Sequence, residues 1–252
     1  MIKTAKFGWI TLVLVTVLFL SSCTGTQTAD SEVASSPTES TPADTTSQTE
    51  STNTDLPILE GRATVELSVN GSAVVIEVNG EQAPITAGNF VDLVQRGVYD
   101  GTVFHRVVRQ PEPFVVQGGD PLSKDPNIPT QQLGTGSFTD PETGEARYIP
   151  LEIKPANAEQ PVYSQTFEEA GITDAPELTH TRGAVAMARS QFPDSASAQF
   201  YIALADLPFL DGNYAVFGQV IEGMEVVDSI QQGDVIESAE VTEGLDNLKT
   251  GN

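Results

Sequence analysis

The feature that most constrains the fold is a series of short β-branched and aromatic runs separated by turn residues, with only two helical patterns between them. Asn70-Gly71 joins the first two runs and is a strong signal for a tight hairpin turn. Many short strands with two widely separated helices predict a mainly β domain, a closed barrel with helical caps, and not an alternation of strands and helices. The runs cover 62–69, 73–78, 102–108, 114–117, 183–188, 199–204, 215–221 and 235–241, with a weaker one at 148–153.

The first helical pattern lies at 83–97. Pro84 suits the first turn of a helix, and Gly97 suits the position just after its end. Apolar residues at 90, 93 and 94 share one face of this helix. A second helix is predicted at 224–231, with an apolar face formed by Val226, Val227 and Ile230.

The N-terminus is typical of an export signal. Lys3 and Lys6 precede an uncharged stretch from 7 to 20, which is shorter than the roughly 20 apolar residues that span a bilayer as a helix. Leu20-Ser-Ser-Cys23 resembles a bacterial lipobox, in which the cysteine is lipidated and becomes the first residue of the mature chain. We therefore predict a signal peptide at 1–22 and a lipid anchor on Cys23. The alternative is an uncleaved membrane anchor with an incidental cysteine.

Residues 24–56 are of low complexity. Sixteen of these 33 residues are serine or threonine, and none is aromatic. Such a segment buries too little apolar surface to offset its conformational entropy, so we predict a disordered tether at 23–56. One domain follows at 57–252, and it includes a loop insertion rich in proline, glycine and threonine at 121–182.

The charge excludes one class of partner and the composition excludes several kinds of site. Residues 57–252 hold ten bases against 29 acids, a net charge of −19 within the −23 of the whole chain. A domain of this charge repels phosphate backbones, so nucleic-acid binding is not expected. A single cysteine and two histidines do not make a cysteine- or histidine-based metal site, and we predict no metal or other cofactor.

Nucleophilic catalysis has little support. The chain has no Gly-x-Ser-x-Gly elbow and no phosphate-binding loop. His105 alternates with Phe104 along a predicted strand, and nothing in the sequence pairs it with a serine. We interpret His105 as a structural residue with satisfied hydrogen bonds.

A second group of residues suggests a binding pocket. An arginine among aromatic, methionine and glutamine side chains describes an apolar pocket with a few convergent polar groups. An ordinary core with one surface arginine is the other interpretation, and the residue types alone leave both open. The group is Arg106, Phe114, Gln117, Met187, Gln199, Phe200, Tyr201, Phe209, Leu210 and Tyr214.

The segments around these residues resemble the successive signatures of the cyclophilins, which are peptidyl-prolyl cis–trans isomerases. The resemblance covers roughly residues 62–241 and is weak at 121–182. It implies an eight-stranded antiparallel closed barrel capped by two α-helices, with a groove on its outer face for an extended, proline-containing peptide. The segments are Pro84–Phe90, Phe104-His-Arg106, Phe114-Val-Val-Gln-Gly-Gly-Asp120, Gly183-Ala-Val-Ala-Met-Ala188, Ala198-Gln-Phe-Tyr-Ile202 and Leu210-Asp-Gly-Asn-Tyr-Ala-Val-Phe-Gly218.

The same resemblance implies a role for each site residue. Arg106 is the catalytic arginine, and Gln117 and Gln199 are expected to hydrogen-bond the peptide backbone. The main chain of Ala188 and Arg189 is expected to pair with the peptide like an added strand. The proline pocket and its rim are expected to be formed by Phe114, Met187, Tyr201, Phe209, Leu210 and Tyr214.

These residue types suit the chemistry. Rotation about an Xaa–Pro bond has a barrier of about 18–20 kcal/mol because it destroys amide resonance. No bond is cut, so the reaction needs no nucleophile and no metal. A fixed guanidinium that donates to the pyramidal proline nitrogen binds the twisted amide better than the planar one.

Some positions depart from the best-studied eukaryotic pattern. Phe209 stands in place of a tryptophan, Tyr214 of a histidine, Arg189 of an asparagine and Val115 of a methionine. Phe209 is expected to weaken binding of the cyclosporin class, which contacts that tryptophan in the family. The stretch 109–113 is about three residues longer than the corresponding loop of the family.

We therefore expect a peptidyl-prolyl isomerase that assists the folding of exported proteins, with proline-containing peptides and unfolded proteins as partners. The alternative is a binding module or chaperone on the same fold without useful turnover. The expected location is the bacterial cell envelope, with the domain held outside the cytoplasm by the lipid on Cys23.

Overall fold

The structure is a computed structural model, and it describes residues 56–250. The predicted signal peptide, the lipidation site Cys23 and almost all of the predicted tether lie outside the described residues. Within residues 56–250, no helix is both long enough and apolar enough to cross a bilayer.

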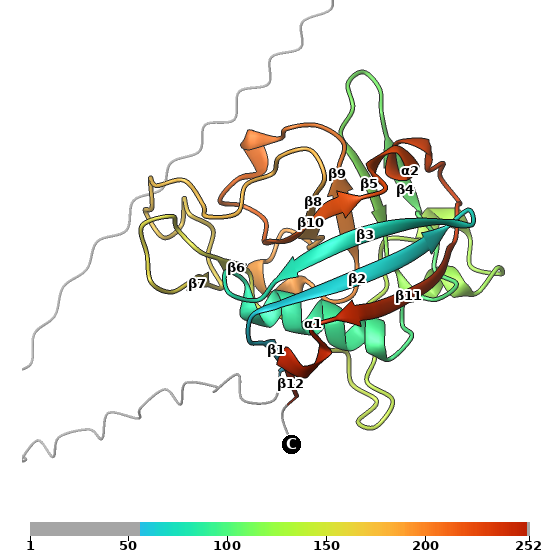
Figure 1. The fold of residues 1–252 in the computed structure, drawn as a ribbon, viewed down its shortest axis with the longest axis horizontal. Coiled ribbons are helices and arrows are strands. Elements are labelled where there is room, and N and C mark those ends of the chain that lie inside the picture. The colour runs from blue at the N-terminus through green and yellow to red at the C-terminus, as the bar shows by residue number, and fades with distance from the viewer. Residues whose placement is uncertain (1–55, 251–252) are drawn as a thin grey trace, which may run out of the picture. The chain divides into compact units, whose positions relative to one another are not determined.

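Eight strands form one antiparallel sheet in the order β11-β2-β3-β10-β8-β9-β5-β4, and the sheet curls around the core (Figure 1). The outermost strands, β11 and β4, are not neighbours in this order. An isolated bridge between Val103 and Val235 joins the segments that precede them. The sheet is thus a curled half-barrel, and the predicted closed barrel is not confirmed. Its strands are β2 (Arg62–Val69), β3 (Ser72–Asn79), β4 (Arg106–Val108), β5 (Val115–Gly118), β8 (Ala184–Met187), β9 (Phe200–Ala203), β10 (Val216–Glu222) and β11 (Ile236–Glu243).

Two α-helices and two small strand pairs complete the described domain. The helices are α1 (Pro84–Gln95) and α2 (Met224–Ser229). β1 (Ile58–Leu59) pairs with β12 (Leu248–Lys249), and β6 (Glu152–Ile153) pairs with β7 (Val162–Tyr163). Short 3₁₀ turns lie at Pro121–Lys124, Thr130–Gln132, Pro193–Ser195, Pro208–Leu210 and Leu245–Asn247.

The hairpin between β2 and β3 follows the sequence signal. Asn70 and Gly71 have φ values of 52° and 70°, the left-handed conformation that asparagine and glycine adopt most easily. Val69 pairs directly with Ser72 across this turn. The register buries alternate side chains of β2, which are Ala63, Val65, Leu67 and Val69.

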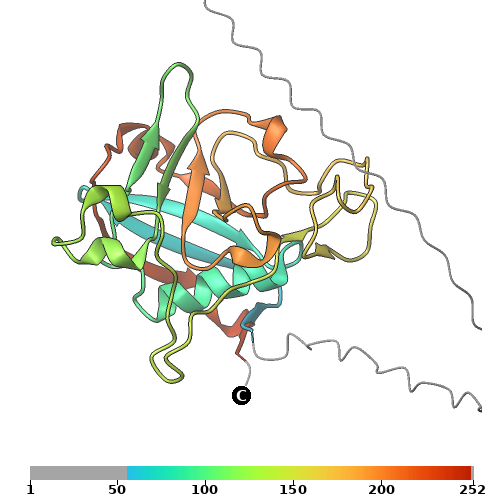
Figure 2. The same cartoon turned by 180° about the vertical axis from the view of Figure 1, so that it is seen from behind.

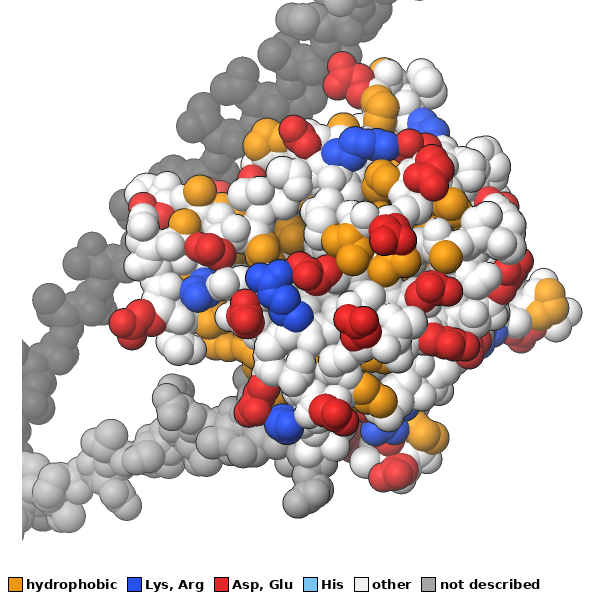
Figure 3. All heavy atoms as spheres, in the orientation of Figure 1, with side chains coloured by type: hydrophobic (Ala, Val, Ile, Leu, Met, Phe, Trp, Pro, Cys, Tyr) orange, Lys and Arg blue, Asp and Glu red, His pale blue; other side chains and the backbone are white. Residues whose placement is uncertain are grey.

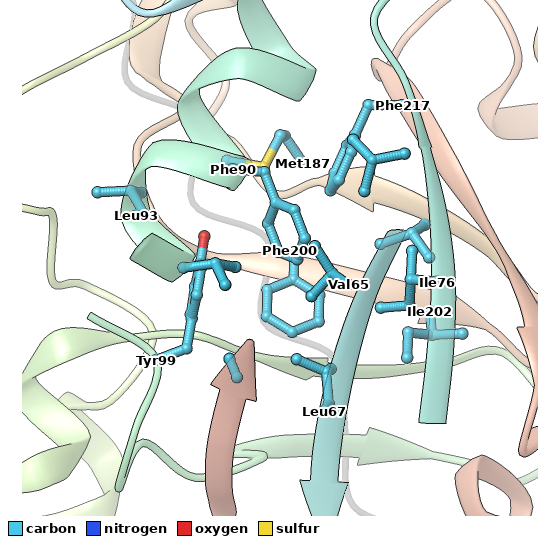
Figure 4. Close-up of a cluster of buried hydrophobic side chains, with 14 of the residues drawn as sticks. Val65, Leu67, Ile76, Phe90, Leu93, Tyr99, Met187, Phe200, Ile202 and Phe217 are labelled. Atoms are coloured by element: carbon cyan, nitrogen blue, oxygen red, sulfur yellow. The ribbon is translucent and has the colours of Figure 1, made fainter. Parts of the chain in front are cut away.

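The main core lies inside the curl of the sheet (Figure 4). Phe90 of α1 packs against Phe217 of β10 and Phe200 of β9, with ring centroids 4.9 and 5.4 Å away. α1 also lies against the segment that leads into β1. A Cβ on Gly88 would stand 2.4 Å from the carbonyl oxygen of Pro57, so this approach requires glycine.

The N-terminus of α1 is capped by the insertion. Ala83, at the N-cap position, provides no side-chain hydrogen bond. Instead the carboxylate of Glu152 accepts from the backbone N–H of Ile85 at 3.2 Å, from that of Thr86 at 2.8 Å and from the Thr86 hydroxyl at 2.7 Å. These bonds satisfy helix donors that would otherwise be unpaired, and they fix the insertion to the core.

The predicted strand at 102–108 is shorter in the structure. Only Arg106–Val108 forms a strand, β4. The preceding residues bond to the segment before β11 instead, since Phe104 N–H donates to the Asp234 carbonyl and Ile236 N–H to the Thr102 carbonyl, both at 2.8 Å. β1, β7 and β12 are not predicted, because two-residue strands leave no periodic pattern.

Candidate active site

A row of side chains crosses four neighbouring strands on the outer face of the sheet. Arg106 pairs with Gln117, Gln117 with Tyr201, and Tyr201 with Ala186. Their immediate neighbours Val116, Phe200 and Ile202 belong to the main core, because successive residues of a strand point to opposite faces. The sheet register therefore brings together Arg106, Gln117 and Tyr201, which are far apart in sequence.

A cavity of about 210 Å³, hereafter the smaller cavity, lies over this row. An apolar cluster that includes Val115, Ala186 and Leu207 lies on the same face of the sheet, with Phe114, Leu210 and Tyr214 packed against it. Eight of the predicted site residues line the cavity together with Val115: Arg106, Phe114, Gln117, Ala188, Arg189, Tyr201, Leu210 and Tyr214.

Met187 does not line this cavity, contrary to expectation. Its side chain is 2 % exposed and packs in the main core, on the opposite face of β8 (Figure 4). Every residue of β8 is buried, so the sequence pattern carries no sign of which side chain faces the groove. The strand offers the groove its small residues instead, Ala186 beneath the cavity and Ala188 in its lining.

Phe209 stands at the rim. Its side chain is 66 % exposed, and its ring stacks on Phe114 at a centroid distance of 6.0 Å and an angle of 17°. The loop at 109–113 projects from the domain between β4 and β5 (Figure 2). Its base is held by Arg109, which donates to the carbonyl oxygens of Val227 and Asp228 at 3.2 and 2.8 Å, at the end of α2.

The side chain of Arg106 is held by two contacts. Its Nη1 atom donates to Gln117 Oε1 at 3.3 Å, and its guanidinium lies 5.4 Å from the centre of the Phe114 ring. Gln117 in turn donates to Gln199 Oε1 at 3.2 Å, and Gln199 donates to the Gly136 carbonyl at 2.8 Å. The arginine is thus linked through two amides to the main chain of the insertion.

Gln199 lines a neighbouring, larger cavity of about 620 Å³. The two cavities share Gln117, Ala188 and Arg189, so they form one continuous groove. The insertion supplies one wall of the larger cavity, through Gly134, Thr135, Gly136, Ser137 and Tyr148.

Arg189 is fixed at the junction of the two cavities. Its Nε and Nη2 atoms donate to the Asn213 carbonyl at 3.0 and 2.7 Å, and Nη1 donates to the Ser190 carbonyl at 2.9 Å. The guanidinium lies 4.8 Å from the centre of the Tyr214 ring. These contacts connect the end of β8 to the loop that carries Leu210 and Tyr214.

A buried polar trio behind the smaller cavity has no counterpart in the sequence analysis. His180 Nδ1 lies 2.8 Å from Asp211 Oδ1, and His180 Nε2 lies 2.9 Å from the Tyr201 hydroxyl. Burial lowers the pKa of His180, although Asp211 opposes this shift, and burial raises the pKa of Tyr201. The residues lie 21 and 31 positions from His180, so no local motif marks their contact.

His105 is buried, but its hydrogen bonds are not satisfied as expected. The residue is 8 % exposed, and neither ring nitrogen has a hydrogen-bond partner among the described residues. Burial lowers its pKa, so the neutral imidazole is favoured. No serine lies within hydrogen-bond distance of the ring in the described domain, which gives no support to a serine hydrolase.

Comparison with known families agrees with this fold. Residues 64–250 match the model of the cyclophilin-type peptidyl-prolyl cis–trans isomerases, and the chain belongs to this family. Two crystal structures of a Cryptosporidium parvum cyclophilin-type isomerase share the fold. One has a TM-score of 0.54 and 24 % identity and covers 72 % of this chain and 98 % of its own. The other, in the presence of the dipeptide Ala-Pro, has a TM-score of 0.53 and 25 % identity over 71 % and 99 %.

Related sequences carry the same family name. A protein of Synechocystis named as a thylakoid lumen peptidyl-prolyl cis–trans isomerase is 44 % identical over 209 residues, 79 % of this chain and 52 % of the relative. A chloroplastic isomerase of Arabidopsis thaliana is 38 % identical, over 77 % of this chain and 45 % of the relative. This chain therefore spans about half the length of these two proteins. An Acinetobacter baylyi isomerase is 35 % identical over 66 % of this chain and 70 % of its own.

Proposed function

We propose that this protein catalyses cis–trans isomerisation of Xaa–Pro bonds in the groove formed by the two cavities. The observation that carries the proposal is the placement of Arg106, held by Gln117 and by the Phe114 ring at the edge of an apolar cavity. The cavity is large enough for a proline ring and lies over an apolar cluster, and Phe114, Leu210 and Tyr201 are the side chains proposed to grip the ring.

The chemistry follows from differential binding of the twisted amide. As the Xaa–Pro bond rotates, the proline nitrogen becomes pyramidal. Its lone pair, which is delocalised into the carbonyl in the planar amide, becomes localised on nitrogen, and the guanidinium of Arg106 donates to it. The planar ground state has no such acceptor, so the interaction lowers the barrier and does not merely tighten binding. Because the contacts with Gln117 and Phe114 fix the guanidinium beforehand, little reorganisation is needed at the moment of rotation.

The peptide backbone is proposed to lie across the groove. The N–H of Ala188 still donates to the Gln199 carbonyl at 2.9 Å, and an extended peptide is proposed to add as a further strand along the main chain of Ala188 and Arg189. Gln117 and Gln199 are proposed to exchange part of their mutual hydrogen bond for bonds to the peptide. Phe209 and Tyr214 complete the proposed rim of the pocket.

The test is isomerisation of a short Xaa–Pro peptide by the full chain and by Arg106→Ala. We expect the substitution to lower kcat/KM by about 10²–10³-fold, the usual effect of removing a transition-state donor. The side chain of Arg106 is exposed, so the thermal transition of the variant should match that of the wild type. Equal rates for the two proteins would remove Arg106 from the mechanism. Peptide binding without acceleration by the wild type would favour a binding module.

We further propose that the protein works on exported chains while anchored to a membrane by lipid on Cys23. The lipobox-like Leu20–Cys23 segment supports this, and the thylakoid lumen location in the name of one relative agrees with export. Cys23→Ser should leave the protein with its signal peptide uncleaved and without lipid, which mass spectrometry of the purified chain detects. Equal masses for the purified wild type and the variant, apart from the substitution itself, would contradict the lipid anchor.

A further inference from the structure

The charged residues of the described domain are distributed unevenly around the groove. Residues 57–252 contain 29 acids and ten bases. Acidic side chains are scattered over the face seen in Figure 3. Among the described residues, however, no acid lines the smaller cavity, whereas two of the ten bases, Arg106 and Arg189, do.

The proposed isomerisation uses the charge of Arg106 but not that of Arg189. Only the main chain of Arg189 has a part in that mechanism, while its guanidinium joins the end of β8 to the loop that carries Leu210 and Tyr214. These bonds need N–H donors, which a neutral amide also supplies, but they do not need a positive charge. The positive charge is therefore a separate property of this groove.

The guanidinium of Arg189 is both fixed and incompletely used. It carries five N–H donors, and three of them bond to the carbonyl oxygens of Asn213 and Ser190. Stacking on Tyr214 further restricts the group. Among the described residues, two donors of this half-buried guanidinium have no partner, and Arg189 lines both cavities.

The larger cavity is also suited to a polar, negatively charged group. Its lining includes five hydroxyl-bearing residues. The hydroxyls of Thr135, Ser190 and Ser195 already donate to other protein atoms, whereas those of Ser137 and Ser197 donate to no other atom of the described residues. The acid in its lining is Asp194, whose Oδ1 atom already accepts from the Leu151 N–H at 3.2 Å. Glu169 is close enough for the charge of Arg189 to help lower its pKa, but its carboxylate is exposed and bonds to Thr166.

We propose that Arg189 makes the groove select proline peptides that carry an acidic side chain within two residues of the proline. The carboxylate would bind the two remaining N–H donors, in the geometry that guanidinium groups favour. The inference rests on the proposed isomerase function and adds a substrate preference to it. Because Arg189 is partly exposed, we expect a preference of about three- to tenfold that salt weakens.

The experiment compares three peptide series that differ only in one residue, which is Glu, Gln or Lys. The variable residue is placed in turn at each of the two positions before and the two positions after a single proline. Exchange NMR spectroscopy measures kcat/KM with the full chain and needs no coupled protease. The readout is the kcat/KM of the Glu peptide divided by that of the Lys peptide, both measured with the same protein. A general loss of activity in a variant lowers both values and so leaves their ratio unchanged.

We expect wild type to favour Glu over Lys at one or more positions, with Gln between them, and the ratio to fall at 0.5 M salt. Arg189→Gln should bring the ratio to about one, and Arg189→Lys should keep part of it. Arg62→Gln is the matched control, since Arg62 pairs with Glu77 and Glu81 and lines neither cavity. It removes the same charge and should leave the ratio unchanged.

Three results would overturn the inference: a wild-type ratio near one at all four positions, a ratio that survives in Arg189→Gln, or an equal loss of the ratio in Arg62→Gln. Failure of the wild type to accelerate any peptide would instead contradict the proposed function. In that case chemical-shift titrations give the dissociation constants of the Glu and Lys peptides. The ratio of these two constants then tests the preference for an acidic residue without any catalysis.

Discussion

His180 Nε2 lies 2.9 Å from the hydroxyl oxygen of Tyr201, and the two rings are within 13° of parallel. Asp211 determines the direction of this hydrogen bond. Its Oδ1 atom accepts from the backbone N–H of His180 and faces His180 Nδ1, so a neutral imidazole carries its proton on Nδ1. Nε2 is then an acceptor, and the Tyr201 hydroxyl donates to it. The wall of the smaller cavity is held in place by a hydrogen bond that depends on an uncharged histidine.

Tyr201→Phe should therefore lower the free energy of unfolding by about 1–3 kcal/mol, because it leaves the buried Nε2 of His180 without a donor. Urea denaturation measures the change. Tyr148→Phe is the control, since Tyr148 is 52 % exposed and should be neutral. A Tyr201→Phe protein as stable as the wild type would show that the hydroxyl is not bound to His180.

Stability should fall as the pH is lowered below about 6.5, the pKa of histidine in an unfolded chain. Burial lowers the pKa of both His105 and His180 in the folded protein, so in this window the unfolded chain binds more protons. Each histidine then contributes a slope of at most about 1.4 kcal/mol per pH unit. Urea denaturation between pH 5 and 8 measures it, and His105→Gln and His180→Gln should each flatten the curve. If the free energy of unfolding of the double variant still falls as steeply below pH 6.5, the pH dependence comes from other groups.

The contribution of Glu152 to stability should change with pH in the opposite direction to that of the histidines. Burial raises its pKa above the value of about 4.3 in an unfolded chain, although the three bonds from α1 and one from Tyr163 oppose the shift. The folded protein binds the proton first, so the contribution of Glu152 to stability falls as the pH rises through this window. Substituting Glu152 by alanine and repeating the urea titration between pH 4 and 6 should remove this component.

Glu152→Gln tests the cap itself. An amide has one acceptor oxygen in place of two, so at least one helix donor loses its partner and stability should fall by about 0.5–2 kcal/mol. Hydrogen exchange at the amides of Ile85 and Thr86 should accelerate. Exchange at the amides of β2 and β3 should accelerate only as much as the decrease in the free energy of unfolding of the whole domain requires. Glu145→Gln, at an exposed position of the insertion, is the control. Unchanged protection at Ile85 and Thr86 would exclude Glu152 as the cap.

Phe209→Trp should increase affinity for the cyclosporin class. A larger indole stacked on Phe114 extends the apolar rim, and an aromatic contact is worth about 0.5–1.5 kcal/mol, or roughly two- to tenfold in affinity. Calorimetric titration gives the dissociation constants. Phe192→Trp places the same ring at an equally exposed site on the larger cavity and should have no effect. Equal gains in the two variants would point to nonspecific apolar binding.

Features encoded by neighbouring residues could be predicted from the sequence. The Asn70-Gly71 turn and the helix start at Pro84 stand where expected, because the backbone preferences of those residues act locally. The groove could be predicted because its residues lie in segments that resemble a known family. Met187 was misplaced because both faces of β8 are buried, which removes the alternation that orients a strand.

Contacts between distant residues could not be predicted. Glu152 is 66 residues from Thr86, and Asp211 is 31 residues from His180. No period or motif connects such pairs, since the fold alone brings them together. The closed barrel could not be tested from the sequence for the same reason. Strand patterns predict how many strands there are, but whether the two outermost strands, β11 and β4, pair with each other depends on side-chain packing between distant residues.

The pairing of β1 with β12 determines how this domain joins the rest of a polypeptide. Its first and last strands leave the domain side by side, so both chain ends emerge from a single point. Such a domain can be inserted into a loop of another protein, or given extra modules at either end, without disturbing its sheet or groove. Extra sequence on either side would therefore leave the sheet and the proposed substrate groove intact.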